Sequence, residues 1–333
     1  MNRLLPTDRI AELCGAESVE VIESIQSLWS GYGEISRVQL LPQRSSAVVK
    51  HVCPPEDRSH KYGWAGDVSH QRKLSSYENE LSWYRGAASK CAGSCRMAKL
   101  IASESVENQW LFVLEDLDAA GFPLRHSRVN DDQLDACLRW LANLHASFVS
   151  ESKTVAHENS LWPIGTYWHL ATRPEELSAM AAGDLKRSAA AIDQKLNEAR
   201  FQTIVHGDAK LANFCFAVDD RVAAVDFQYV GAGCGIKDVA YFISSCFSDG
   251  ECEQREEELL SNYFGRLEIA LASRLDAGSL AFAKIEAEWR ALYPVAWADF
   301  YRFLAGWSPG HWKMHGYSKR VAESVLENLG EYR

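Results

Sequence analysis

The spacing of apolar residues divides the chain into a strand-rich first third and a largely helical remainder. Two runs of β-branched and aliphatic residues, 34–41 and 47–52, flank the turn-forming segment PQRSS, which predicts a β-hairpin. Residues 75–89 have a helical spacing with Leu81 on the apolar side, and residues 109–117 form a short apolar run typical of a buried strand. The first third therefore predicts a small sheet accompanied by a helix.

From about residue 130 the apolar positions follow the period of a helix. Asn130 and Gln133 have the spacing of a helix cap, and they open a long helical segment. Its apolar positions are Leu134, Leu138, Leu141, Leu144 and Phe148. Helical patterns continue to the C-terminus, except in residues 201–230, where short strands alternate with loops. Strands first and helices later predict an α+β fold of two lobes with a cleft between them.

Charge and hydropathy restrict the class of partner. The chain has 333 residues and a formal net charge of −10, which argues against non-specific binding to nucleic acid or an anionic membrane. No apolar stretch approaches the length that crosses a bilayer, and the first residues lack the apolar core of a secretory signal. We expect neither a nucleic-acid nor a membrane partner, while the oligomeric state stays open.

The cysteines indicate a reducing compartment. There are nine, an odd number, and they are scattered along the chain. The close pairs Cys91/Cys95 and Cys246/Cys252 have neither zinc-finger spacing nor a nearby histidine. Most lie in apolar patterns, where a free thiol behaves as a small hydrophobic side chain. We expect reduced cysteines and a cytoplasmic location.

The segments VHGDAKLANF and VAAVDFQ contain the candidate catalytic residues. Phosphoryl transfer needs a base near the acceptor hydroxyl, oxygen ligands for Mg²⁺ and positive charge near the phosphates. Asp208, in a loop after a strand, can accept the acceptor's proton, and Asn213 can offer an amide oxygen to the metal. Asp226, at the end of an apolar strand, adds a carboxylate suited to Mg²⁺. This ordered pattern is that of kinase catalytic and metal loops, so it predicts an ATP- and Mg²⁺-dependent phosphotransferase.

Together with VLEDLDAAGFPLR, LANLHASF and KDVAYFISS, these segments resemble the aminoglycoside phosphotransferase and choline kinase superfamily. Within it, the chain is most similar to the ecdysteroid-kinase-like group. The similarity is clearest from Trp110 to Ser245 and weaker from Gly31 to Tyr84. It implies a protein-kinase-like bilobal fold, with a nucleotide-binding N-lobe over residues 1–117 and a mainly helical C-lobe over 118–333.

The resemblance also implies roles in binding the nucleotide phosphates. Lys50 matches the strand lysine that contacts the ATP phosphates, and Glu80 matches the helix glutamate that pairs with it, with Glu78 as the alternative. Gly31 and Gly33 match the loop that covers the phosphates.

Two further segments carry implied roles. Backbone groups of Glu115 and Leu117, in the hinge, would bind adenine. Asp238 matches an acidic residue that braces the catalytic loop.

Two positions depart from the superfamily pattern. Gln228 stands where many aminoglycoside enzymes have a second acidic residue, which leaves the metal with one carboxylate fewer. Lys210, two residues after Asp208, resembles the lysine of serine/threonine kinases and could neutralise charge on the transferred phosphate. The chain lacks the long activation segment of a protein kinase. It retains the base, the lysine and both metal ligands, so an active enzyme is favoured over a protein kinase or an inactive nucleotide-binding pseudokinase.

The acceptor is expected to be a small molecule with a hydroxyl group, and several kinds fit the same loops: choline or ethanolamine, an aminoglycoside, a sugar or a steroid alcohol. The superfamily places the acceptor in the helical lobe. Asp299 and Arg302, embedded in an aromatic stretch, could form a salt bridge, or Asp299 could meet a polar acceptor. The candidates for lining the acceptor site are Trp297, Asp299, Trp307, Trp168 and Arg173.

Overall fold

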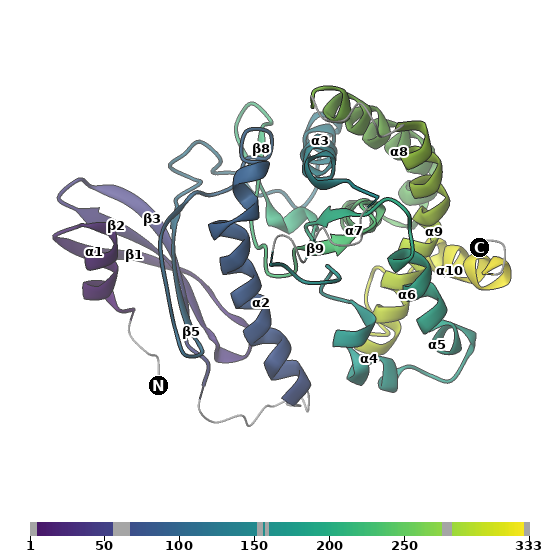
Figure 1. The fold of residues 1–333 in the computed structure, drawn as a ribbon, viewed down its shortest axis with the longest axis horizontal. Helices are drawn as coiled ribbons and strands as arrows, with labels where there is room; N and C mark the ends of the chain where they lie inside the picture. The colour runs from purple at the N-terminus through teal and green to yellow at the C-terminus, as the bar shows by residue number, and fades with distance from the viewer. Residues whose placement is uncertain (1–4, 56–66, 152–155, 157–159, 275–281, 330–333) are drawn as a thin grey trace.

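A computed structural model describes residues 5–55, 67–151, 156, 160–274 and 282–329. Its N-terminal part contains a five-stranded antiparallel sheet, and its C-terminal part is mainly helical (Figure 1). The sheet order is β1-β2-β3-β5-β4. The strands are β1 (Ser18–Ser27), β2 (Gly33–Leu41), β3 (Ser45–Val52), β4 (Leu100–Val106) and β5 (Gln109–Glu115).

The two faces of the sheet are covered by different helices. Helix α1 (Thr7–Cys14) packs on one face, where Val49 of β3 belongs to the core. The long helix α2 (Asp67–Arg85) lies along the other face, where Phe112 of β5 belongs to the core (Figure 1). Lys50 is directly opposite Phe112 in the β3–β5 ladder, so strand alternation turns its side chain toward α2.

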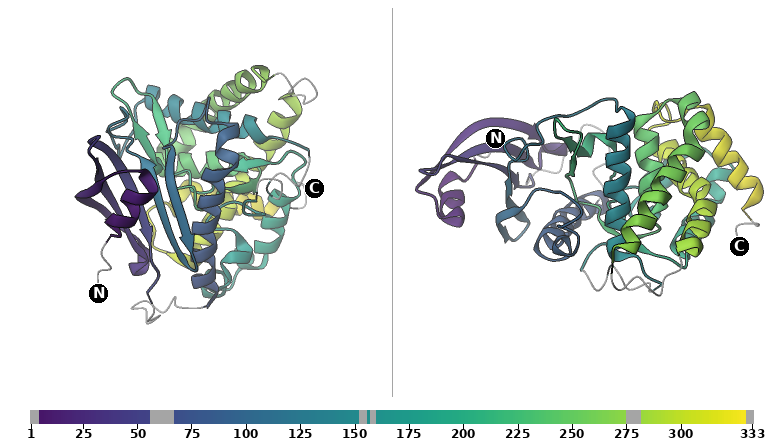
Figure 2. Two further views of the ribbon diagram at one scale, coloured as in Figure 1. Left: turned by 60° about the vertical axis from the view of Figure 1, so that its left-hand side comes forward. Right: turned by 90° about the horizontal axis from the view of Figure 1, so that it is seen from above.

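The C-terminal part is built around α3 (Asp131–Phe148), and its long helices run side by side at the end of the molecule away from the sheet (Figure 2). The other helices are α4 (Pro174–Ala179), α5 (Asp184–Arg187), α6 (Ala189–Asn197), α7 (Ile236–Cys246), α8 (Asp249–Ala272), α9 (Phe282–Trp307) and α10 (Gly316–Asn328). Asn130 and Gln133 form the predicted capping box: each side chain bonds the other residue's backbone N–H. Apolar residues of α3, α7, α8 and α9 share one core.

Two short strand pairs lie between the sheet and these helices and carry the candidate catalytic loops. Strand β6 (Thr203–Val205) pairs with β9 (Gly231–Gly233), and β7 (Phe214–Phe216) pairs with β8 (Val222–Ala224), both antiparallel. All four strands are buried. Loops that leave such strands start from fixed positions, which suits the precise placement of catalytic side chains.

The predicted α+β architecture, a small antiparallel N-terminal sheet followed by a mainly helical C-terminal part, is confirmed. The hairpin at 34–41 and 47–52 is β2–β3, but α2 begins at Asp67, earlier than predicted, and ends at Arg85. Strands β1 and β4 were not predicted. The division into lobes at residue 117 stays a prediction; β5 ends two residues before it.

Two other expectations concern the chain as a whole. All nine cysteines lie within the described residues and none is paired in a disulfide. Of the helices in the described ranges, none is both long and apolar enough to span a membrane.

Candidate active site

Lys50 connects the N-terminal sheet to α2 and to the candidate metal ligand. Its Nζ lies 2.6 Å from Oε2 of Glu80 and 3.8 Å from Oδ1 of Asp226. Lys50 and Glu80 are both buried. Burial lowers the pKa of Lys50, but the carboxylates of Glu80 and Asp226 outweigh it, so the pKa is raised and the lysine stays charged. The site therefore holds a fixed positive charge beside the loop that ends β8.

The structure also distinguishes the two glutamates that the sequence left open. Glu80 points to Lys50, whereas the Glu78 carboxylate accepts a hydrogen bond from Nε1 of Trp110 at 2.9 Å. Two residues along a helix are about 200° apart, so one of the two faces the lysine and the other does not. This geometry favours Glu80 as the partner of Lys50.

The loop that carries Asp208 is held by Asp238 of α7. The buried Asp238 carboxylate accepts hydrogen bonds from the backbone N–H groups of His206 and Gly207, at 2.6 and 3.0 Å, and lies 3.1 Å from Nε2 of His145. Gly207 has φ of +78°, and a Cβ there would lie 2.1 Å from the carbonyl oxygen of Tyr229. Only glycine fits this position, directly before Asp208.

Asp208 is buried and has charged and amide neighbours on one oxygen. Its Oδ2 accepts hydrogen bonds from Nζ of Lys210 at 2.9 Å and from Nδ2 of Asn213 at 3.0 Å. Its Oδ1 is buried and makes no hydrogen bond with the described residues. Burial raises the pKa of Asp208, opposed by Lys210 and reinforced by Asp226. A carboxylate with a raised pKa and an unused oxygen is suited to accepting a proton.

Asp226 follows β8 and lies beside Asn213. The backbone N–H of Val225 donates to the carbonyl of Asn213 at 3.0 Å, which ties the two loops together. Asp226 has φ of +69°, a left-handed conformation that is uncommon for residues other than glycine and that is often found at functional sites. Its Oδ1 makes no hydrogen bond with the described residues, although Lys50 is close.

These residues fit a magnesium site of the kind that needs few protein ligands. The amide nitrogen of Asn213 donates to Asp208, which leaves the amide oxygen available. Asp226 offers a carboxylate oxygen without a hydrogen bond. No cluster of three or more His, Cys, Asp or Glu ligands exists among the described residues. Mg²⁺ commonly binds through one or two protein oxygens, with phosphates and water completing its coordination.

The predicted hinge residues already make several hydrogen bonds within the protein. At the end of β5, the N–H of Glu115 donates to Lys99 and its carboxylate is paired with Arg96; the carbonyl of Leu117 accepts from Phe122. The predicted adenine contacts would therefore use the Glu115 carbonyl and the Leu117 N–H.

Gly31 and Gly33 flank the turn between β1 and β2. Gly33 has φ of +137°, and a Cβ there would lie 1.9 Å from the carbonyl oxygen of His51, so a side chain would be strained and would clash. The role of this turn in phosphate binding stays a prediction.

The residues predicted to line the acceptor site do not gather on one surface. Trp168 donates from Nε1 to the Asp299 carboxylate at 2.9 Å, and Arg302 donates to the same carboxylate at 2.8 Å. All three are fully buried, and Trp297 is 2% exposed within the core. The salt-bridge alternative is thus the one observed, and burial argues against acceptor contact for Trp168, Trp297 and Asp299.

The two remaining acceptor candidates have different surroundings. Arg173 is buried and paired with Glu176 at 2.9 Å. Trp307, 41% exposed, stacks on Phe303 at the end of α9. Of the five candidates, only Trp307 has a substantial exposed surface.

Several residues near Asp208 were not predicted. Tyr241 of α7 lies close enough for Asp208 to raise the pKa of the phenol, after burial as the main cause, and its hydroxyl is 3.4 Å from that of Tyr167. Asn79 of α2 ties the metal loop in place by donating to the carbonyls of Gln228 and Val230. These are ordinary polar residues within helical patterns, and the sequence contains no motif that marks them.

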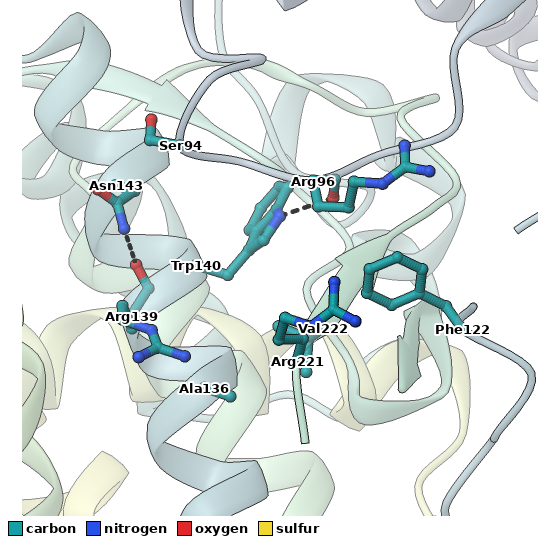
Figure 3. A pocket seen from close by; sticks show the side chains of 9 residues that line it. All are labelled: Ser94, Arg96, Phe122, Ala136, Arg139, Trp140, Asn143, Arg221 and Val222. Carbon is teal, nitrogen blue, oxygen red and sulfur yellow. Dashed lines mark hydrogen bonds between the residues drawn. The ribbon is translucent and has the colours of Figure 1, made fainter. Parts of the chain in front are cut away.

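A separate cavity of about 180 Å³ lies next to α3 and β8, and its lining includes arginine side chains and aromatic rings (Figure 3). Figure 3 shows the indole of Trp140 between the other lining residues, and its Nε1 donates a hydrogen bond to the carbonyl of Arg96. Its lining residues are Ser94, Arg96, Phe122, Ala136, Arg139, Trp140, Asn143, Arg221 and Val222. None of the predicted site residues lines it, so it is distinct from the catalytic loops.

Comparison with known proteins gives a family match in the region of these loops. Residues 166–274 match the model of the ecdysteroid kinase-like family, a segment that includes Asp208, Asn213 and Asp226. No curated protein matches the chain. The resemblance expected from the sequence is confirmed for this segment.

Solved structures with similar folds have low identity to this chain. A choline kinase, LicA, from Streptococcus pneumoniae is 14% identical with a TM-score of 0.46, covering 98% of this chain and 97% of its own. A Plasmodium vivax ethanolamine kinase is 11% identical with a TM-score of 0.47, covering 95% and 84%. A thermostable mutant of the aminoglycoside phosphotransferase APH(4)-Ia, in complex with ADP and hygromycin B, is 12% identical with a TM-score of 0.49, covering 97% and 98%.

Proposed function

We propose that this protein is a small-molecule kinase that transfers the γ-phosphate of ATP to a hydroxyl group of its acceptor. The observation that carries the proposal is the convergence of three separate segments. Lys50 from the sheet, Asp208 from the loop after β6 and Asp226 from the end of β8 are held within one network of charges. Phosphoryl transfer depends on positioning and charge more than on covalent catalysis by the protein, and this network supplies both.

Asp208 is the proposed base. Its free Oδ1 would accept the proton of the acceptor hydroxyl while Oδ2 stays hydrogen-bonded to Lys210 and Asn213. Lys210 keeps the carboxylate oriented and places a positive charge next to the reacting oxygen. The brace from Asp238 fixes the loop backbone, so the base needs little reorganisation before it acts.

Lys50, Asn213 and Asp226 are the proposed nucleotide and metal ligands. Lys50 would contact the phosphates, and Asn213 and Asp226 would hold Mg²⁺ through one amide oxygen and one carboxylate. Bound Mg²⁺ neutralises charge on the phosphates. Because the side chain of Gln228 is neutral, the loop adds no second carboxylate at that position. The backbone carbonyl of Gln228 accepts hydrogen bonds from Asn79 and Trp162, which hold the loop in place.

A test replaces Asp208 with asparagine, which keeps the shape of the side chain and removes its basicity. The wild type is screened against a library of hydroxyl metabolites for acceptor-dependent ADP formation. With any acceptor so found, Asp208→Asn should lower kcat by roughly 10²–10⁴-fold, the contribution of a positioned base, while Mg-ATP affinity measured by calorimetry is retained. Asp219→Asn, in the exposed turn between β7 and β8, is the matched control.

Two outcomes count against the proposal. A kcat for Asp208→Asn within a few-fold of the wild type would remove Asp208 from the role of base. A wild type that binds Mg-ATP but forms no acceptor-dependent ADP with any library member would favour an inactive nucleotide-binding protein instead.

A further inference from the structure

Lys313 is a buried lysine that lies against aromatic rings near the catalytic loop. It belongs to the segment between α9 and α10 and is 7% exposed. Its Nζ lies 4.4 Å from the ring centroid of Tyr241, 5.3 Å from that of Phe300 and 5.6 Å from that of Trp312. Its backbone is fixed as well, because its carbonyl accepts from Oγ of Ser318 at 2.8 Å. The ammonium group is therefore held in one place.

This ammonium has no ion-pair partner among the described residues, although the charge of Asp208 acts on it. Within the part of the chain that the structure describes, Lys313 Nζ makes no hydrogen bond and no ion pair. The rings offer cation–π attraction, but they carry no formal negative charge. Burial lowers the pKa of Lys313 to about 8, although Asp208 acts in the opposite direction. Keeping an unpaired ammonium here costs stability, and such a cost is commonly maintained for a functional reason.

The position of Lys313 is on the side of Asp208 that faces the C-terminal helices. Tyr241, whose ring Lys313 covers, and Ser245 lie one turn apart on the same face of α7. Oγ of Ser245 accepts a hydrogen bond from the N–H of Leu211 in the loop of Asp208 at 2.8 Å, so this face of α7 packs against that loop. Lys50, by contrast, reaches Asp226 from the sheet side. Lys313 is thus linked through α7 to the loop of Asp208, and the charges of Asp208 and Lys210 act on it.

Exposed aromatic rings continue from Lys313 to the surface. Trp312 is 59% exposed and stacks with His311, and His311 lies against Trp307, whose ring is 41% exposed. Such rings offer an apolar contact beside a single positive charge, the combination that recognises a flat or apolar molecule carrying an acidic group.

We propose that Lys313 determines acceptor specificity by pairing with an anionic group, such as a carboxylate, on the acceptor whose hydroxyl is phosphorylated. This inference rests on the proposed function. A carboxylate would give the buried ammonium the counterion it lacks, whereas an ammonium on the acceptor would be repelled at the same place. Acceptors with a hydroxyl and a carboxylate on an apolar frame are therefore favoured over cationic alcohols.

The γ-phosphate of ATP is the other anion that Lys313 could meet. Lys50 and Lys210 are already placed near Asp226 and Asp208, where the phosphates would lie. Lys313 contacts the rings of Tyr241 in α7 and Phe300 in α9 instead. The two sources are separated by measuring nucleotide affinity and acceptor affinity in the same variants.

The experiment uses three para-substituted benzyl alcohols of similar size that differ in charge: 4-(hydroxymethyl)benzoate, 4-methylbenzyl alcohol and 4-(aminomethyl)benzyl alcohol. Their affinities for the full-length protein are measured by ligand-detected NMR, and the affinity for Mg-ATP by calorimetry. The benzoate should bind most tightly to the wild type. Lys313→Met should weaken benzoate binding about tenfold or more, the usual effect of losing a buried charged partner. It should leave the neutral alcohol and Mg-ATP within about twofold.

Two further variants serve as controls. Lys313→Arg keeps the charge and should keep the preference for the benzoate. Lys319→Met removes an exposed lysine of α10 and should change none of the affinities.

The proposal is overturned if the benzoate does not bind, if the three compounds bind equally, or if the cationic alcohol binds best. It is also overturned if Lys313→Met weakens Mg-ATP instead of the benzoate, because the anion would then be a nucleotide phosphate. Failure of the proposed function looks different: the wild type would bind no Mg-ATP, or would form no ADP with any acceptor, whatever the benzoate affinities are.

Discussion

Replacing Lys313 with methionine is expected to stabilise the protein at neutral pH. Most buried-site substitutions destabilise, so the sign of this prediction is informative. Methionine has nearly the same length and flexibility as lysine, fills the same space against the rings of Tyr241 and Phe300, and carries no charge to desolvate. The variant should therefore keep the packing around the site while removing its electrostatic cost.

The size of the cost follows from the pKa of Lys313. Burial lowers this pKa from its ordinary value of 10.5 to about 8. Because each pKa unit corresponds to about 1.4 kcal/mol, holding the charged lysine in the folded protein costs about 3 kcal/mol at pH 7. The lost cation–π attraction offsets about 1–2 kcal/mol of this. Lys313→Met should thus be more stable than the wild type by about 1–2 kcal/mol at pH 7.

The dependence on pH isolates the charge from every other effect of the substitution. Between pH 8 and 10.5 the unfolded chain binds more protons at Lys313 than the folded chain does, so wild-type stability rises with pH through this site. Below pH 8 both states are protonated and the full cost is present. At pH 9.5 the cost falls to about 1 kcal/mol, so the wild type should gain about 2 kcal/mol on the variant between pH 7 and 9.5.

Urea unfolding at the two pH values measures this difference, since other titrating groups affect both proteins equally. Lys319→Met, at an exposed lysine, provides the baseline and should show no such change with pH. If the wild type gains less than about 0.5 kcal/mol on Lys313→Met between pH 7 and 9.5, the ammonium is hydrated in solution. The argument for an unbalanced buried charge would then fail.

Two further predictions concern the proposed nucleotide site. Glu80→Gln should weaken Mg-ATP binding and turnover together, because Lys50 loses its charged partner. Glu78→Gln disturbs only the hydrogen bond to Trp110 and should leave Mg-ATP affinity within about twofold. Equal effects of the two variants in calorimetry would contradict the assignment of Glu80. Asp226→Ala should abolish the Mg²⁺ dependence of nucleotide binding, since the metal loses its carboxylate ligand, and calorimetry that finds unchanged Mg-ATP affinity would rule Asp226 out.

The candidate catalytic loops could be selected from the sequence because the proposed chemistry requires fixed spacings within short segments. Asp208 and Asn213 are five residues apart in one loop, and Asp226 lies two residues after β8, the second strand of a tight hairpin. Each of these positions depends on local chain geometry. The choice between Glu78 and Glu80 could not be made in this way, because it depends on where α2 meets β3, a contact between segments thirty residues apart.

The acceptor side could not be predicted for the same reason. The aromatic stretch of α9 is regular enough to be a core helix, and the structure shows that Trp297 and Asp299 are indeed buried there. The sequence shows that Asp299 and Arg302 can pair. It does not show that Trp168, 131 residues away, donates a hydrogen bond to the other oxygen of the Asp299 carboxylate.

The burial of Lys313 could not be predicted from the sequence either. In the sequence it is one lysine in a polar turn between two helices, and a lysine in a turn is usually solvated. Its burial arises because Ser318 holds its carbonyl and because Tyr241, from a different helix, lies beneath its ammonium group. Acceptor recognition through Lys313, as proposed, therefore depends on contacts between distant segments, while the proposed chemistry depends on local motifs. That difference explains how one sequence can predict phosphoryl transfer and leave the acceptor open, and it makes Lys313 the residue through which the acceptor can be sought.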